Sequence, residues 1–398
     1  MKKSIFLAMC ASLLAFTACD KDEVAKKYQV SVTISSENVQ DLQDISAIAT
    51  SESGSETKGT VEGTTATFQL PAGSYTVSVS AKDDFFNYVG STKLSVADKD
   101  VNAKVELIKS KPAGSIIFKE IYATGVKSYY WTDGFYELVN NTDEVQYLDG
   151  IIMGIVQNGY GEISSWADTL TGALPDYYPM GNHTVYFPGN GTDYPLQPGQ
   201  SVVCATRAID HSSRELGQGD VASPVDLSHA DWDIFIPSSM QDTDNPDVPN
   251  MLVAYSQFGF DFMPATSGQS LILAKLPKGI TVDEFVKNPD NLKKPEGVYM
   301  AALCIPAEYV IDAVDILYFN EDKNIFKSIL DSDDAGYTYA SEKDDEWADP
   351  MYSGKSIRRK CSKVENGRAY FMDTNNSSND FIAGGQTPVL YRSFKTAD

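Results

Sequence analysis

Short runs in which apolar and polar residues alternate are the feature that most limits what this chain can fold into. Tyr28–Ile34 reads Tyr-Gln-Val-Ser-Val-Thr-Ile, and Tyr75–Ala81 reads Tyr-Thr-Val-Ser-Val-Ser-Ala. This period of two places alternate side chains on opposite faces of a strand, so one face is buried and the other is solvated. Turn formers such as Pro71-Ala72-Gly73 bound these runs. With 22 Tyr and 18 Phe in the chain, the pattern predicts a mainly all-β fold.

The first residues have the composition of an export signal. Lys2 and Lys3 precede the mostly apolar stretch Ile5–Phe16, which is too short to span a bilayer. The small residues Thr17 and Ala18 stand directly before Cys19. We interpret residues 1–18 as a lipoprotein signal peptide whose cleavage leaves a lipidated Cys19. The alternative is an ordinary secretory signal followed by an incidental cysteine.

A lipid on Cys19 would provide the membrane attachment, because several acyl chains on one residue give stable anchoring. Residues 19–27 form an acidic tether that begins Asp20-Lys21-Asp22-Glu23. Such a sequence resembles the export signal of some Gram-negative lipoproteins. We therefore expect a lipid-anchored protein of the outer membrane that faces the cell exterior. An ordinary solvated linker is the alternative for the tether.

Charge and cysteine content exclude several classes of partner and scaffold. The formal net charge of −23 repels nucleic acid and anionic lipid head groups, and its simplest role is solubility. Three cysteines, Cys204, Cys304 and Cys361, remain beyond the signal and the lipidation site. Since three thiols allow one bridge at most, we expect no disulfide framework and treat them as buried structural residues.

We divide the remainder into two β domains. Residues 28–108 form a small N-terminal sandwich, in which Leu70–Val77 resembles prealbumin-like and carboxypeptidase-regulatory modules. Residues 109–114 form a linker, and residues 115–398 form a larger β domain.

The larger domain resembles lamin-tail-like domains, which are immunoglobulin-like sandwiches. Its opening contains Phe135-Tyr136-Glu137-Leu138-Val139-Asn140, a polar turn, and Leu148-Asp149-Gly150. Further segments follow in the order of that family: Leu196–Val203, Gly268–Leu273, Tyr309–Val314, Gly354–Arg359 and Asp373–Phe381.

The larger domain is longer than lamin-tail domains, with insertions at 155–195, 207–265 and 321–352. The whole arrangement is similar to an uncharacterised family of outer-membrane lipoproteins encoded near TonB-dependent receptors. That resemblance implies cargo capture or assistance to a transport receptor.

Two segments bear on the helix content. Val310–Val314 matches a strand of the lamin-tail family, although Pro306 and the apolar spacing also allow a helix that begins there. A short helix at 282–287 is favoured because Thr281 and Glu284 form a capping box.

The sequence contains no recognisable catalytic motif. The three histidines, His183, His211 and His229, lie in no zinc-binding spacing, and neither a Cys-x-x-Cys pair nor a Gly-x-Ser-x-Gly elbow occurs. We therefore predict that the protein is not an enzyme and has no cofactor. A triad assembled from distant residues stays open as a third hypothesis, an unrecognised hydrolase.

Two sets of residues are candidates for binding. Asp242, Asp244 and Asp247 carry oxygen ligands in a calcium-loop-like spacing, although solvated acidic loops are the simpler interpretation. Aromatic residues in or beside loops could stack on sugars, porphyrins or corrins, or cover the ends of a sandwich. These are Tyr129, Tyr130, Trp131, Tyr160, Trp166, Tyr177, Tyr178 and Tyr186.

The sequence thus predicts a non-catalytic cell-surface lipoprotein that captures a ligand or assists an outer-membrane TonB-dependent receptor. The alternative is an adhesion or structural surface protein without a small ligand.

Overall fold

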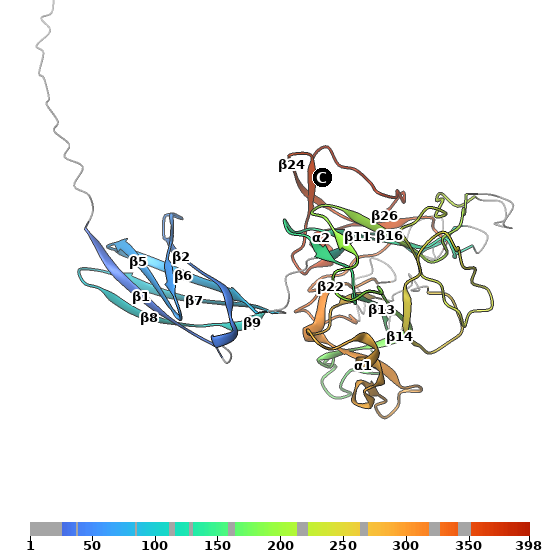
Figure 1. The fold of residues 1–398 in the computed structure, drawn as a ribbon, viewed down its shortest axis with the longest axis horizontal. Coiled ribbons are helices and arrows are strands. Elements are labelled where there is room, and N and C mark those ends of the chain that lie inside the picture. Colours follow the sequence, from blue (N-terminus) through green and yellow to red (C-terminus); the bar gives the residue numbers. More distant parts are fainter. Residues whose placement is uncertain are drawn as a thin grey trace, which may run out of the picture. The chain divides into compact units, whose positions relative to one another are not determined.

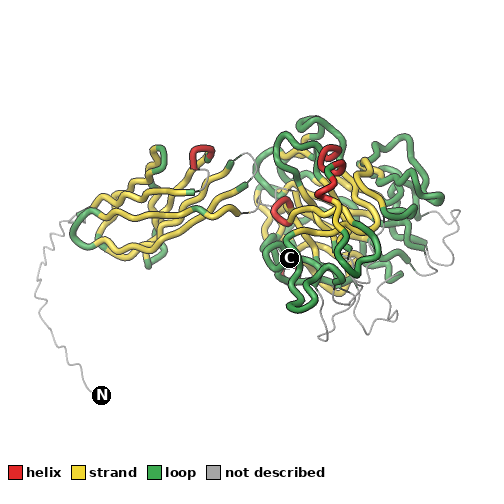
Figure 2. The backbone as a smooth tube through the Cα atoms, turned by 90° about the horizontal axis from the view of Figure 1, so that it is seen from below, coloured by secondary structure: helices red, strands yellow, loops and turns green. Residues whose placement is uncertain are grey.

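The chain divides into two compact units of β structure. The computed structural model describes residues 26–36, 39–83, 86–110, 116–126, 130–157, 164–212, 222–262, 270–317, 327–340 and 352–398. The smaller unit lies within Met1–Lys82 and Tyr88–Ile108, and the larger unit comprises Asp83–Asn87 and Lys109–Asp398. Strands make up most of the regular structure of each unit, and the helices are short (Figure 2). Most of the linker predicted at 109–114 falls outside the described residues.

The smaller unit contains two sheets (Figure 1). One has the spatial order β4 (Thr60–Glu62), β5 (Thr65–Pro71), β1 (Lys27–Ser35) and β8 (Val101–Glu106). The other has the order β3 (Glu56–Lys58), β2 (Gln43–Ser51), β6 (Gly73–Lys82), β7 (Asn87–Val96) and β9 (Ile108–Ser110), and a 3-10 turn spans Val39–Asp41.

The alternating runs of the sequence form strands with one buried face. In β1, Val30 and Val32 are 0% exposed, while the intervening residues are partly or fully exposed. Val30 lies opposite Phe68 of β5, and Val77 of β6 is also fully buried. The two sheets therefore enclose a core of alternate side chains, as the period of two predicts.

The larger unit is built on two larger sheets. The first has the order β17 (Trp232–Asp233), β16 (Ser201–Ala205), β11 (Phe135–Asn140), β10 (Ile116–Tyr122), β23 (Ser356–Arg359) and β26 (Phe381–Gln386). The second has the order β20 (Leu292–Lys293), β21 (Ala302–Pro306), β14 (Tyr177–Tyr186), β13 (Ile152–Val156), β19 (Leu271–Ala274) and β22 (Val310–Val314), with β18 (Leu252–Ser256) paired to β14.

Smaller elements complete this unit. They are the pair β12 (Gln146–Tyr147) and β15 (Pro195–Leu196), the hairpin β24 (Cys361–Glu365) and β25 (Arg368–Phe371), the helices α1 (Val282–Lys287) and α2 (Ser377–Asp380), and 3-10 turns at Pro289–Asn291 and Ala307–Tyr309.

Apolar side chains cover both faces of the two larger sheets. Phe118 of β10 and Leu273 of β19 belong to the core between the sheets. Ile272, the neighbour of Leu273, instead packs on the outer face with Phe285 of α1. On the first sheet, Val203 of β16 likewise packs on the face away from the central core. Strands buried on both faces lose the apolar–polar alternation that marks a half-exposed strand.

One edge of the second sheet is tied to the first sheet by a buried ion pair. Arg359 of β23 donates two hydrogen bonds of 2.8 Å to the Asp312 carboxylate of β22. Asp312 also accepts a 2.7 Å bond from the Phe118 backbone N–H, and the Phe118 carbonyl accepts one from Arg359 Nε. Arg359 is 1% exposed, so the charges lie inside the protein.

The mainly β fold with short helices is confirmed. Val310–Val314 is strand β22, and the helical tendency near Pro306 is limited to the preceding 3-10 turn. The capping box is also confirmed, because Thr281 and Glu284 bond reciprocally at the start of α1. Within the described residues, no helix has the length and apolarity that crossing a membrane requires.

Candidate functional site

A groove in the larger unit lies where β14, β18 and β19 meet the loops that leave them. It has a volume of about 720 Å³ and is lined by the segments 186–191 and 275–283, with Asp149, Gly150 and Leu252. Ligand sites typically occupy roughly 300–1,000 Å³, so the groove has room for a small molecule.

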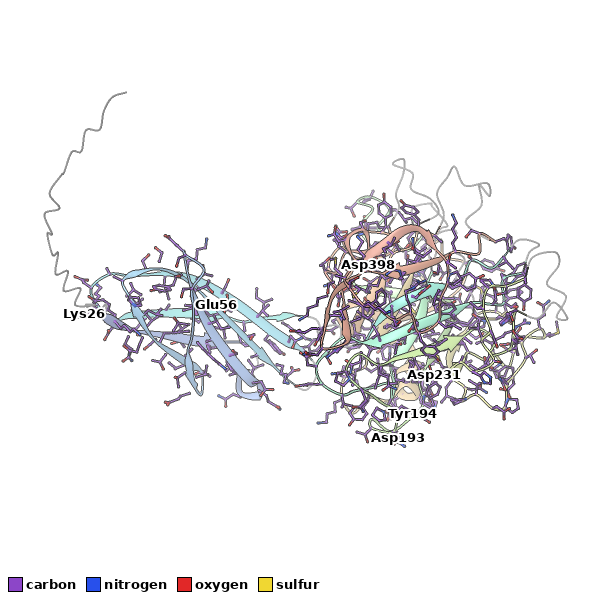
Figure 3. The ribbon with its side chains drawn as sticks, turned by 90° about the horizontal axis from the view of Figure 1, so that it is seen from above. Lys26, Glu56, Asp193, Tyr194, Asp231 and Asp398 are labelled. Carbon is purple, nitrogen blue, oxygen red and sulfur yellow. The ribbon has the colours of Figure 1, made fainter. Side chains whose placement is uncertain are left out.

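One wall is a loop folded around a single carboxylate. Asp149 Oδ1 accepts hydrogen bonds from the backbone N–H groups of Gly191 (3.0 Å) and Asp193 (2.8 Å), and Oδ2 accepts one from Tyr194 (2.9 Å). Asp193 and Tyr194 lie together at one margin of the larger unit (Figure 3). Because its acceptors are occupied and it is 7% exposed, Asp149 acts as a brace for the loop.

The same loop needs a glycine at one position. Gly189 has φ +123°, and a Cβ built there would lie 2.1 Å from Asp149 Oδ1. A side chain would therefore displace the carboxylate that orders the loop. Gly191 also has a positive φ, +107°, but a Cβ there would meet nothing within 4 Å.

The floor and the opposite wall present apolar surface. Tyr186 at the end of β14 lies directly opposite Leu252 of β18, and such cross-strand pairs share one face of a sheet. Leu252 and Ile280 are each 43% exposed. The Tyr186 hydroxyl donates a 3.3 Å bond to Asp283, the second residue of α1. The capped helix thus helps to fix the tyrosine ring at the groove.

Lys275 is the most unusual polar residue of the groove. It follows β19, where Leu271 and Leu273 face the central core, so the strand alternation carries its side chain to the end of that core. Burial lowers the pKa of Lys275, and the nearby Asp149 carboxylate offsets this in part. Its ammonium forms no hydrogen bond or ion pair with the residues that the structure describes, and its nearest charged influence is Asp149.

The lining is suited to binding. Neither serine, cysteine nor histidine lines the groove in the described part of the chain. Its carboxylates are Asp149, which is occupied by backbone N–H groups, and Asp283, which pairs with Lys287 at 3.4 Å. The groove therefore combines apolar walls with one partly buried cation.

The predicted aromatic residues do not gather at one place. Tyr186 lines the groove, whereas Tyr178 is 1% exposed and its hydroxyl bonds to Asp333 in the interior. Trp166 is 5% exposed and packs edge-to-face on Tyr177, with ring centroids 6.3 Å apart.

Tyr130 and Trp131 lie at another place. The Tyr130 hydroxyl bonds to His211 Nδ1 at 2.5 Å, and the Trp131 ring packs on Tyr352 at 5.7 Å. His211 Nε2 lies 2.9 Å from the Arg207 carbonyl, which can only accept. His211 Nδ1 is therefore the acceptor for Tyr130. Burial lowers the pKa of His211 to about 4, which keeps the imidazole neutral.

Two of the three predicted calcium ligands are engaged in protein contacts. Asp242 accepts bonds from the backbone N–H groups of Ile236 and Thr243 and lies 3.6 Å from Arg207 Nε. Asp244 accepts a 2.9 Å bond from the Asn250 amide. Asp247 is exposed. Among the described residues, no three carboxylate, histidine or cysteine groups are placed to hold a metal ion.

The remaining predicted residues are the cysteines and two tyrosines. Cys204, Cys304 and Cys361 are buried and unpaired. Cys19, Tyr129 and Tyr160 lie outside the described residues.

Sequence reasoning included Tyr186 and missed Asp149 and Lys275 as site residues. Both residues lie next to segments that the sequence marks as strand or turn, and those segments indicate fold and give no sign of a binding site. The signal that could have found Lys275 is its position two residues after Leu273, where the strand alternation predicts another buried side chain.

Comparison with known proteins gives relatives without a named activity. The family described as "Protein of unknown function (DUF4876)" matches residues 197–388. A crystal structure of a DUF4876 family protein from Bacteroides thetaiotaomicron matches with a TM-score of 0.57 and 25% identity, over 92% of this chain and 96% of that one. No curated protein matches this sequence.

Two further structures are much less similar to this chain. A DUF3823 family protein from Parabacteroides merdae has a TM-score of 0.17 and 8% identity, over 35% of this chain and 69% of that one. A proposed adhesin from Bacteroides ovatus has a TM-score of 0.20 and 9% identity, over 69% of this chain and 84% of that one.

Proposed function

We propose that this protein is a non-catalytic, lipid-anchored binding protein of the outer-membrane surface, and that the groove beside Tyr186 holds its ligand. The observation that carries the proposal is the groove itself, where a braced loop and a capped helix flank exposed apolar side chains. Preformed concave sites with apolar walls and a few polar groups are typical of small-molecule binding.

The anchoring and the partnership rest on the sequence. Cys19 and the acidic tether support lipidation and surface display. The resemblance to lipoproteins encoded near TonB-dependent receptors supports delivery of the captured ligand to such a receptor.

The test is affinity purification of the full-length lipidated protein from native outer membranes in mild detergent. Bound proteins and small molecules are identified by mass spectrometry. We expect a small molecule that the wild type retains and the Tyr186→Ala variant loses. The matched control is Tyr299→Ala, because Tyr299 is 89% exposed and does not line the groove. Recovery of a stoichiometric receptor would support the partnership. Recovery of the lipoprotein alone would overturn ligand capture.

Exposed aromatic residues favour adhesion as a second candidate. Phe258 and Phe260 are 42% and 64% exposed, with ring centroids 6.1 Å apart. Asp261, the next residue, accepts bonds from Arg207 and Ser239, so the aromatic pair stands on a fixed loop. If this surface holds a macromolecule, Phe260→Ser should abolish attachment of protein-coated beads to cells, whereas Tyr186→Ala should not.

A further inference from the structure

The position of Lys275 indicates what kind of ligand the groove takes. An ammonium group can donate three hydrogen bonds, and withdrawing it from water without a partner is unfavourable. Lys275 is partly buried, and its backbone N–H already bonds to the Tyr309 carbonyl, which fixes the base of the side chain. The ammonium has no partner among the described residues, so an anion brought by the ligand would supply the missing acceptors.

The nearby carboxylates do not supply them. Both oxygens of Asp149 accept backbone hydrogen bonds, and among the described residues Asp149 forms no ion pair with Lys275. Asp283 is directed to Tyr186 and Lys287. Burial makes the charged form of Lys275 less favourable, and a bound anion would reverse that effect.

The other lining residues are largely apolar. Tyr186 and Leu252 form a cross-strand pair on the outer face of the second sheet, whereas Lys275 follows the end of β19 on the face of the central core. Pro277 and Ile280 lie in the segment that continues from Lys275. A tyrosine ring beside aliphatic side chains favours a flat, ring-shaped body in van der Waals contact. The lining thus separates into an apolar face and two lysines, of which Lys275 is partly buried and Lys278 is exposed.

We infer that the groove binds an amphipathic carboxylate, whose ring lies against Tyr186 and Leu252 on the outer face of the sheet while its carboxylate extends past the strand ends and accepts hydrogen bonds from Lys275. This inference rests on the proposed function and specifies its ligand class. Uronic-acid saccharides and porphyrin carboxylates share this chemistry, and the two arms of the experiment distinguish them.

The experiment measures affinity for matched acid and neutral probes with the purified full chain. One arm compares a uronic-acid trisaccharide with a neutral hexose trisaccharide by calorimetry. The other compares protoporphyrin IX with its dimethyl ester by fluorescence quenching. A hydrogen bond to a charged group contributes enough to change affinity by about 10- to 100-fold. We therefore expect the wild type to prefer one acid over its neutral match by that factor.

Lysine variants assign the preference to its residue. Lys275→Met should abolish the preference for the acid, and Lys275→Arg should retain most of it because the charge remains. The matched control is Lys294→Met, because Lys294 is exposed and does not line the groove. Its effect should stay within about 3-fold, as for other exposed charge pairs.

The outcomes separate the inference from the proposed function. Equal affinity for acid and neutral probes, with binding lost in Tyr186→Ala, overturns the carboxylate class and leaves the groove as a binding site. A preference that survives Lys275→Met overturns the role of Lys275. If the wild type binds neither acid, the inference is wrong, while a different ligand recovered from membranes would still support the proposed function.

Discussion

Arg359 and Asp312 form a buried ion pair that joins the two large sheets, with two bonds of 2.8 Å between side chains that are 1% and 4% exposed. Asp373 and Asp380 lie 3.4 and 3.7 Å from the same guanidinium. The pair also holds both backbone polar groups of Phe118. Its loss would therefore leave charges and backbone groups without partners in the core.

The first prediction concerns this pair. Asp312→Asn should lower the free energy of unfolding by about 3–5 kcal/mol, because it removes the closest carboxylate of a buried guanidinium, while Asp373 and Asp380 lie farther away, at 3.4 and 3.7 Å. Urea denaturation measures the change. As the control, Glu365→Gln breaks the exposed Lys363–Glu365 pair and should cost less than about 1 kcal/mol. Equal effects of the two substitutions would contradict the prediction.

The second prediction uses the two glycines of the groove loop. Gly189→Ala should destabilise the protein more than Gly191→Ala, because its Cβ would clash with Asp149, whereas Gly191 carries only backbone strain of about 1–3 kcal/mol. Thermal unfolding of both variants tests the order. Gly189→Ala should also weaken retention of the groove ligand. If the variant keeps wild-type stability and full ligand binding, Asp149 does not order the loop.

The third prediction is a pH dependence at Asp315. Burial, with a contribution from Asp334, raises its pKa to about 7 in the folded state, above about 3.9 in the unfolded chain. The folded state therefore favours the protonated form, and this stabilisation is present below about pH 4 and is lost as pH rises through 7. Relative to wild type, Asp315→Asn should become more stable as pH rises from 4 to 8. Denaturation at several pH values checks this, and a constant difference would refute it.

The fourth prediction is a pH dependence at His211, where stability is lost as the pH falls. The folded-state pKa of His211 is about 4, below about 6.5 in the unfolded chain. Its contribution to stability is present above pH 6.5 and is lost as pH falls towards 4, because the unfolded chain gains a proton first. The stability advantage of wild type over His211→Gln should shrink over that range. A difference that grows on acidification would rule this out.

How far the sequence predicts the fold depends on how many faces of a strand are buried. In β1 and β6 one face meets solvent, so the alternation of Tyr28–Ile34 and Tyr75–Ala81 marks each strand correctly. In β10 every residue from Ile116 to Tyr122 is buried, including Lys119 and Glu120. Lys119 pairs with Glu137 at 2.6 Å, a partner supplied by the neighbouring strand. Local pattern cannot show such pairing, because it depends on tertiary contacts.

The site was less predictable for a related reason. Tyr186 has a residue type that suits binding, so it could be selected by itself. Asp149 falls in the Leu148-Asp149-Gly150 segment, which indicated only a fold, and Lys275 belongs to no motif, so their relevance arises when three separate loops meet. Tyr178 and Trp166 are aromatic like Tyr186, yet both are buried.

The strand order of the larger unit has a consequence for the time course of folding. Ser356 of β23 donates a 2.6 Å bond to Glu120 of β10, across a separation of 236 residues. The first strand of this unit thus lies between β11 and a strand near the end of the chain. Such distant pairings close large loops and slow folding. The first sheet cannot be completed until β23 and β26 have been synthesised. In the smaller unit, by contrast, β2 needs only β3 and β6, which follow shortly after it. We expect the smaller unit to be structured while the larger one still awaits its last strands.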